Sequence, residues 1–128
     1  MHQSLDLFQT AHAMARHAGA RQALVAQNIA NADTPRYEAR HIPPFQDVFE
    51  AGADVQMRTT RAGHLSAAAA PGTNATTLTS STEPSPNGNT VSLEEEMMNA
   101  VAISREHNRA LTIYRHTMTV LRTSLGRN

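Results

Sequence analysis

Apolar residues recur at helical spacing over the first quarter of the chain. From Ser4 to Ala30 the sequence contains no proline and one glycine, Gly19. Positions three, four and seven apart share a face of an α-helix, so this spacing predicts an amphipathic helix. Its apolar stripe consists of Leu7, Ala11, Met14, Ala18, Val25 and Ile29. Because the stripe contains alanine, we expect another helix to approach it closely. We assign residues 1–32 to this N-terminal helix, and Pro35 prevents its continuation.

A second helical pattern begins near Ser92. Ser92 followed by Glu95 matches a capping box, in which each side chain bonds to the other residue's backbone N–H group. Beyond it, the spacing alternates between four and three residues, as in the seam of a coiled coil. The seam comprises His107, Leu111, Tyr114, Met118, Leu121 and Leu125, and Leu93, Met97 and Ala100 continue it backward. Residues 91–128 are therefore predicted to form a C-terminal helix.

The middle of the chain, residues 33–90, has a different character. It holds all six prolines, and Thr73 to Asn89 is rich in Thr, Ser and Asn. Such a composition buries too little apolar surface to offset chain entropy of about 1–2 kcal/mol per residue. We therefore expect a loop-rich, partly disordered segment. Short apolar stretches at Phe45–Phe49 and Val55–Met57 could form a helical turn or a strand, and the pattern does not decide between them.

Together these patterns predict a mainly α fold. Two long amphipathic terminal helices should pack as a coiled-coil-like pair, parallel or antiparallel, with a largely irregular middle segment. Two helices alone cannot cover both apolar stripes and the flanking Met98, Val101 and Ile113. We expect the remaining apolar surface to contact other protein chains.

Composition indicates a thin core. The chain has 128 residues, only 4% of them aromatic, and no tryptophan. Since aromatic side chains supply much of the buried area in most cores, we expect low stability in isolation and a gain of order on association. Cysteine is absent, which excludes disulfides and Cys-based zinc sites. The N-terminus lacks the pattern of a cleaved signal peptide, and no apolar run approaches the roughly 20 residues of a membrane span.

Candidate chemical sites are weak. The seven histidines are scattered, and His12 and His17 are five residues apart, unlike the i, i+4 pair of helical zinc sites. Glu94, Glu95 and Glu96 fit the first turn of a helix, where acidic side chains favour the helix dipole. Eleven basic and eleven acidic residues give zero net charge, which argues against nucleic acid as a partner. We expect no enzymatic activity, cofactor, metal or small-molecule substrate.

Two separated motifs resemble those of the bacterial flagellar rod and hook axial proteins. Residues 27–37 read Gln-Asn-Ile-Ala-Asn-Ala-Asp-Thr-Pro-Arg-Tyr, similar to the family signature Asn-Ile-Ala-Asn…Thr-Pro-Gly-Tyr. Residues 87–97 read Asn-Gly-Asn-Thr-Val-Ser-Leu-Glu-Glu-Glu-Met, similar to the entry into the C-terminal helix of short rod proteins. Their order and the chain length resemble the B-type proximal rod proteins of the flagellar basal body. Arg36 departs from the signature, because glycine is usual there. If that position requires positive φ, arginine costs about 1 kcal/mol or more.

The resemblance implies a subunit of a tubular rod that crosses the periplasm and transmits motor torque. Its implied partners are other rod subunits, further copies of itself, the adaptor between rod and membrane ring, and the flagellar type III export apparatus, which exports such chains without signal cleavage. Alternatives are a C-type proximal rod protein or, from another class, a helical flagellar export chaperone.

The resemblance also implies roles for individual residues. The exit from the first helix is assigned to Asn28, Ile29, Ala30, Asn31, Thr34, Pro35 and Tyr37. Helix packing or assembly is assigned to Leu7, Met14, Val25, Ile29, Met97, Leu111, Tyr114, Met118, Leu121 and Leu125. Ser92 and Glu95 are assigned to the helix cap. Packing within one chain and contact between subunits both remain open for the helix residues.

Overall fold

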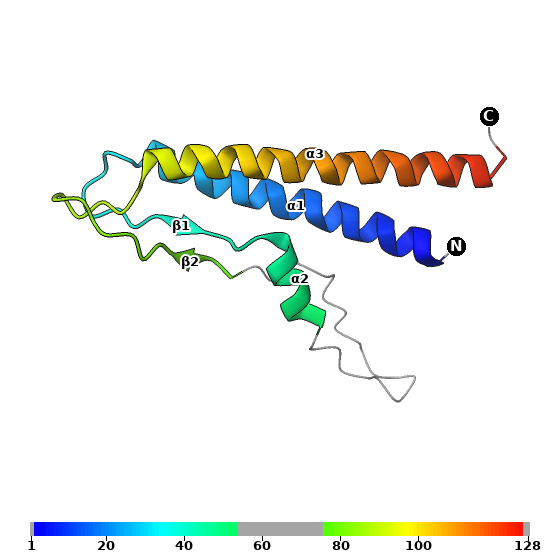
Figure 1. Cartoon of the computed structure of the whole chain (residues 1–128), viewed down its shortest axis with the longest axis horizontal. Helices are drawn as coiled ribbons and strands as arrows, with labels where there is room; N and C mark the ends of the chain where they lie inside the picture. The colour runs from blue at the N-terminus through cyan, green and yellow to red at the C-terminus, as the bar shows by residue number, and fades with distance from the viewer. Residues whose placement is uncertain (1, 54–75, 127–128) are drawn as a thin grey trace.

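The computed structural model describes residues 2–53 and 76–126. Two long helices lie side by side, α1 (His2–Ala30) and α3 (Leu93–Ser124), and an arm runs along one side of them (Figure 1). The arm contains strand β1 (Arg40–His41), helix α2 (Phe45–Ala53) and strand β2 (Leu78–Thr79). The mainly helical fold predicted from the sequence is confirmed.

The two long helices run antiparallel. Phe8 near the start of α1 stacks on Tyr114 late in α3, with ring centroids 4.6 Å apart. At the other end, the Asn28 side chain bonds to Glu96 in the first turn of α3. Both chain termini therefore lie at one end of the molecule, and the connecting segments lie at the other (Figure 1). This decides the orientation that the sequence pattern left open.

The contact between α1 and α3 is centred on small and medium-sized side chains. Ala18, Val25 and Ile103 form the buried apolar cluster, with Ala100 packed against it. Alanine permits close approach of two helices because its side chain adds little bulk between the backbones. The buried core is correspondingly thin.

The register of α3 differs from the predicted seam. The buried residues of α3 are seven apart: Glu96, Ile103, Ala110 and Thr117. The predicted seam positions Met97, Leu111 and Met118 each follow a buried residue by one position. The prediction placed the largest apolar residues on the buried face of α3. Instead, the small residues Ala110 and Thr117 lie on that face, and the larger side chains lie next to it.

The arm is built from a short antiparallel pair and one helix. Arg40 pairs with Thr79 and His41 with Leu78. Phe45 in the first turn of α2 packs edge-on against His17 of α1, with ring centroids 5.5 Å apart. The stretch Phe45–Phe49 therefore adopts the helical alternative, whereas Val55–Met57 lies outside the described residues.

Both ends of α3 show specific capping geometry. The Ser92 side chain accepts a hydrogen bond from the Glu95 backbone N–H at 3.4 Å, and three glutamates occupy the first turn. At the far end the Leu125 N–H donates to the Leu121 carbonyl, and Gly126 adopts a φ of 68°. A glycine in this left-handed conformation is a common helix terminator.

Candidate functional site

Asn28 links three segments of the chain at the junction end of the molecule. Its side-chain NH₂ donates to the Arg40 carbonyl at 2.8 Å and to Glu96 Oε1 at 3.0 Å. Its Oδ1 accepts from the Tyr37 hydroxyl and from the Arg40 N–H, both at 3.2 Å. The residue is 1% exposed, and both of its donor hydrogens and its acceptor oxygen are used. An amide with this full set of bonds fixes α1 to β1 and α3 at once.

Asn31 and Thr34 shape the turn that leaves α1. The Asn31 NH₂ donates back to the Gln27 carbonyl at 2.8 Å, and its Oδ1 accepts from the Thr34 hydroxyl at 3.1 Å. The Thr34 N–H donates to the Asn31 carbonyl at 3.0 Å. Short polar side chains thus satisfy backbone groups freed at the helix end, as expected of turn-forming residues. Within the same motif, Ile29, Ala30 and Pro35 are exposed.

Asn89, from the second motif, closes this turn from the opposite side. Its NH₂ donates to the carbonyls of Asn31 at 2.9 Å and Thr34 at 2.8 Å. Its Oδ1 accepts from the Val91 N–H at 2.7 Å, just before α3 begins. The two motifs, whose bonded residues are 58 and 55 positions apart, therefore form one hydrogen-bonded junction. Asn89 lies within the second motif, but no role was predicted for it.

Arg36 adopts positive φ within this junction. Its φ is 57°, and it is the only non-glycine residue with positive φ in the described part of the chain. Its N–H donates to the Asn87 carbonyl at 3.1 Å. A Cβ on the adjacent Gly88, whose φ is 80°, would lie 3.4 Å from the Arg36 Cα. The turn thus keeps the left-handed conformation although arginine replaces the usual glycine.

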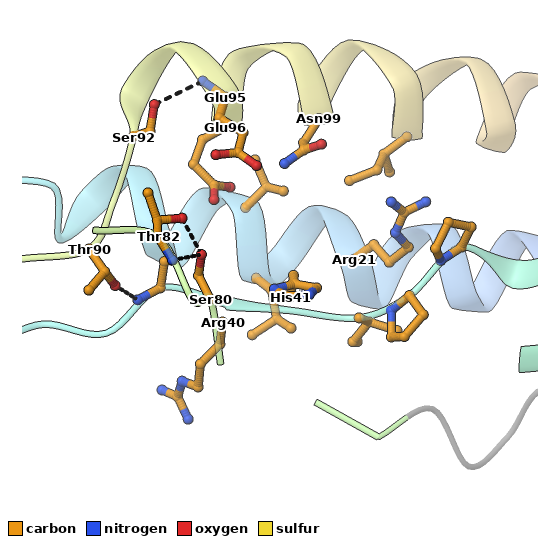
Figure 2. Close-up of a pocket in the computed structure, with 17 residues that line it drawn as sticks. Arg21, Arg40, His41, Ser80, Thr82, Thr90, Ser92, Glu95, Glu96 and Asn99 are labelled. Carbon is orange, nitrogen blue, oxygen red and sulfur yellow. Dashed lines mark hydrogen bonds between the residues drawn. The ribbon is translucent and has the colours of Figure 1, made fainter. Parts of the chain in front are cut away.

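Glu96 is a buried carboxyl beside the junction. It is 7% exposed, and its Oε2 has no hydrogen-bond partner among the described residues. Burial raises the pKa of this carboxyl; the hydrogen bond from Asn28 lowers it, the charge of Glu95 raises it and that of His41 lowers it. Figure 2 shows Glu95 and Glu96 extending from the first turn of α3 toward the β1 segment.

A second buried polar group, His17, lies under α2. It is 4% exposed, and neither ring nitrogen has a hydrogen-bond partner in the described ranges. Burial lowers the pKa of His17, the charge of Arg21 lowers it further, and Glu106 opposes both. Arg21 itself pairs with Glu106 at 2.7 Å. The Arg21–Glu106 pair joins α1 to α3, whereas His17 packs against the Phe45 ring of α2.

Neither a metal site nor a membrane span emerges from the described residues. Within residues 2–53 and 76–126, no group of three or more His, Cys, Asp or Glu side chains could hold a metal ion. In the same ranges no helix is long and apolar enough to cross a bilayer.

Comparison with known proteins decides the family. No family model matches the chain. The flagellar basal body rod protein FlgB of Agrobacterium fabrum is 33% identical over 114 residues, covering 83% of this chain and 82% of that protein. The FlgB of Cereibacter sphaeroides strain ATCC 17029 is 30% identical over 105 residues, covering 82% of each. The chain belongs to the FlgB family of flagellar basal body rod proteins. The resemblance to the B-type proximal rod proteins is thereby confirmed.

The side chains predicted to pack or assemble divide into three groups by exposure in this FlgB-family chain. Val25 is buried, and a second set is half-buried: Met14, Leu111, Tyr114, Met118 and Leu121. Exposed members are Leu7, Ile29, Met97 and Leu125. Val25 belongs to the buried cluster between α1 and α3, and Tyr114 of α3 contacts Phe8 of α1. The roles of these residues in assembly remain predictions.

Exposed apolar side chains gather on both helices of this FlgB-family fold. Leu5 and Leu7 are exposed near the start of α1, and a longer set follows α3: Leu93, Met97, Met98, Val101, Val120 and Leu125. Met98 is 74% exposed and Val101 is 54% exposed. Since they are three residues apart on a helix, they share a face. Such surfaces are typical of protein interaction sites.

Proposed function

We propose that the chain is a structural subunit of the proximal rod, assembling through its terminal helices. The observation that carries the proposal is the exposed apolar face of Met98 and Val101 on a helix pair of the FlgB family. Two antiparallel helices leave this face uncovered, and burying it against neighbouring subunits is favourable by about 25 cal/mol per Å² of apolar area. Other rod subunits and further copies of the chain are the proposed neighbours.

The proposal extends to the setting of the rod. The chain crosses the periplasm as part of the rod, contacts the adaptor between rod and membrane ring, and transmits motor torque along its coaxial helices. It reaches that place through the flagellar type III export apparatus without signal cleavage. A thin core without cysteine supports this route, because such a chain is easily kept unfolded for passage through a narrow channel. Its role is structural, without enzymatic activity or a cofactor.

A double substitution on the exposed face tests assembly directly. The M98D/V101D variant should retain its helical circular dichroism, because both side chains point to solvent in the isolated chain. Its incorporation into basal bodies, and the swimming of a strain that lacks the native chain, should fall by about tenfold or more, since each 1.4 kcal/mol of lost contact is a factor of ten.

The control for this test is Q22E/Q27E, two substitutions at exposed positions of α1. It adds two negative charges, as M98D/V101D does, without removing apolar surface, and it should incorporate normally. Normal incorporation of M98D/V101D would contradict the proposed interface. Loss of incorporation in both variants would mean that added charge, rather than lost apolar contact, is responsible.

A further inference from the structure

A groove of about 270 Å³ lies between the first turn of α3, the middle of α1 and the β1 segment. Its polar lining includes Arg21, His41, Glu95, Glu96 and Asn99. Figure 2 shows these side chains arranged around the space between α3 and β1. A water molecule occupies about 30 Å³ of liquid volume, so the groove has room for a polar group larger than one water.

The groove contains a carboxylate oxygen that the chain itself does not satisfy. Glu96 is more than nine-tenths buried, and its Oε1 takes the hydrogen bond from Asn28. Its Oε2 is buried and has no partner among residues 2–53 and 76–126. A buried acceptor without a partner costs free energy, which makes a donor from elsewhere favourable.

The two arginines that line the groove do not neutralise this carboxylate. Arg21 is engaged by Glu106, with 2.7 Å between Nη1 and Oε2. The Arg40 side chain points away from Glu95 and Glu96 in Figure 2. His41 is the remaining basic side chain near Glu96. Its charge lowers the pKa of Glu96, but the groove still presents two adjacent carboxyl groups beside this single histidine, an arrangement that suits a further cation from outside the chain.

A guanidinium group matches this arrangement. It is planar, permanently charged and carries several N–H donors in a fixed geometry that suits carboxylates. It would donate to the exposed Glu95 carboxylate, and to the buried Glu96 Oε2 once the side chains that cover that oxygen move aside. Burial already raises the pKa of Glu96, so an incoming guanidinium would favour the charged form of that carboxyl.

The same chain carries suitable arginines at its opposite end. Beyond Glu106, α3 contains no acidic residue, and its arginines Arg109, Arg115 and Arg122 are exposed. In the described part of the chain the only ion pair joins Arg21 to Glu106. Arg115 and Arg122 are seven residues apart and therefore share a helix face.

These arginines cannot reach the groove of their own chain. Arg115 follows Glu96 by nineteen positions in one continuous helix, which is about 28 Å at 1.5 Å per residue. That distance far exceeds the length of an arginine side chain. A guanidinium from this region can enter the groove only when it belongs to a second copy.

We propose that the groove at Glu95 and Glu96 is a socket for Arg115 or Arg122 of a second copy of this chain. The contact joins the acidic junction end of one subunit to the basic terminal end of the next. This inference rests on the proposed function as a rod subunit. The contact would fix how far neighbouring copies are shifted relative to one another along their helix axes.

Sedimentation of the purified full chain at low salt tests the socket. Glu96→Gln removes the charge but keeps an Oε1 that can accept from Asn28, so the junction is preserved. We expect this variant, and R115Q/R122Q, to raise the dissociation constant for self-association about tenfold. Because both remove the same contact, combining them should cause no further large rise.

The matched controls are Glu94→Gln, in the same helical turn, and Arg105→Gln, in the same helix. Neither should change self-association by more than about twofold, since exposed single charges contribute little. Equal dissociation constants for Glu96→Gln and Glu94→Gln would overturn the socket, and so would a chain that stays monomeric at the highest soluble concentration. Incorporation of the unaltered chain into basal bodies is measured in parallel, so failure of the socket and failure of the rod proposal give different results.

Discussion

Arg36 shows how one residue can carry strain inside an otherwise satisfied turn. Its φ of 57° lies in the left-handed region, which costs L-amino acids about 1–2 kcal/mol. Its N–H bonds to the Asn87 carbonyl, and Gly88 packs against it. The surrounding junction therefore holds Arg36 in place despite the cost.

Arg36→Gly should stabilise the isolated chain. Relief of the left-handed strain outweighs the extra entropy of glycine, which costs about 0.5–1 kcal/mol, so the net gain should be about 0.5–1 kcal/mol. Urea denaturation measures this gain as a higher midpoint. Arg40→Gly serves as the control, since Arg40 lies in β1 without positive φ and its replacement should lower the midpoint. A lower urea midpoint for Arg36→Gly than for the native chain would contradict backbone strain at Arg36.

Individual polar residues of the core could not be found from hydrophobic periodicity. Asn28, Asn89 and Glu96 are all buried, although each is polar or charged. Hydrophobic periodicity assigns polar residues such as these to the solvent-exposed surface. The family motifs did point to Asn28 and to the segment containing Asn89. Their hydrogen-bond partners, however, lie up to 68 residues away in the chain and depend on the three-dimensional fold.

The junction between elements depends on Asn89. It donates to two carbonyls of the turn after α1 and accepts from Val91 at the start of α3. Asn89→Ala removes these three hydrogen bonds. The Asn31 and Thr34 carbonyls keep one backbone donor each, from Thr34 and Tyr37, whereas the Val91 N–H loses its acceptor. We expect a loss of about 2–3 kcal/mol in the free energy of unfolding, because three hydrogen bonds of about 0.5–1.5 kcal/mol each are lost.

Chemical denaturation compares Asn89→Ala with Asn108→Ala. Asn108 is exposed on α3 and its side chain makes no hydrogen bond in the described structure, so its replacement should change stability by no more than about 0.5 kcal/mol. Similar midpoints for the two variants would show that the junction does not hold the elements together.

The helices themselves were predictable, whereas their register was not. The absence of proline and the capping box placed them close to the observed His2–Ala30 and Leu93–Ser124. The predicted seam of α3 was shifted by one residue from the observed buried face, because large apolar residues contribute most to hydrophobic periodicity. Closely packed helices instead place Ala18, Ala110 and Thr117 between their backbones, and Leu111 and Met118 flank that contact.

At the scale of the whole molecule, the chain is elongated and has a thin core. One buried cluster of Ala18, Val25 and Ile103 holds two long helices together. Leu5 and Leu7 near one terminus and Leu125 near the other remain exposed. Helical turns with few buried contacts open readily. We therefore expect the terminal end to be the least stable part of the isolated subunit and to gain most from its neighbours.

Amide hydrogen exchange on the purified chain, alone and within isolated basal bodies, tests the central claim most directly. We predict fast exchange in the free chain for the first turns of α1 and the last turns of α3, with slower exchange at the Asn28–Asn89 junction. Incorporation should slow exchange at the terminal end by about tenfold or more, since neighbours that bind only the folded helices stabilise them. Equally slow exchange along both helices in the free chain, unchanged in the basal body, would contradict a subunit that completes its fold on assembly.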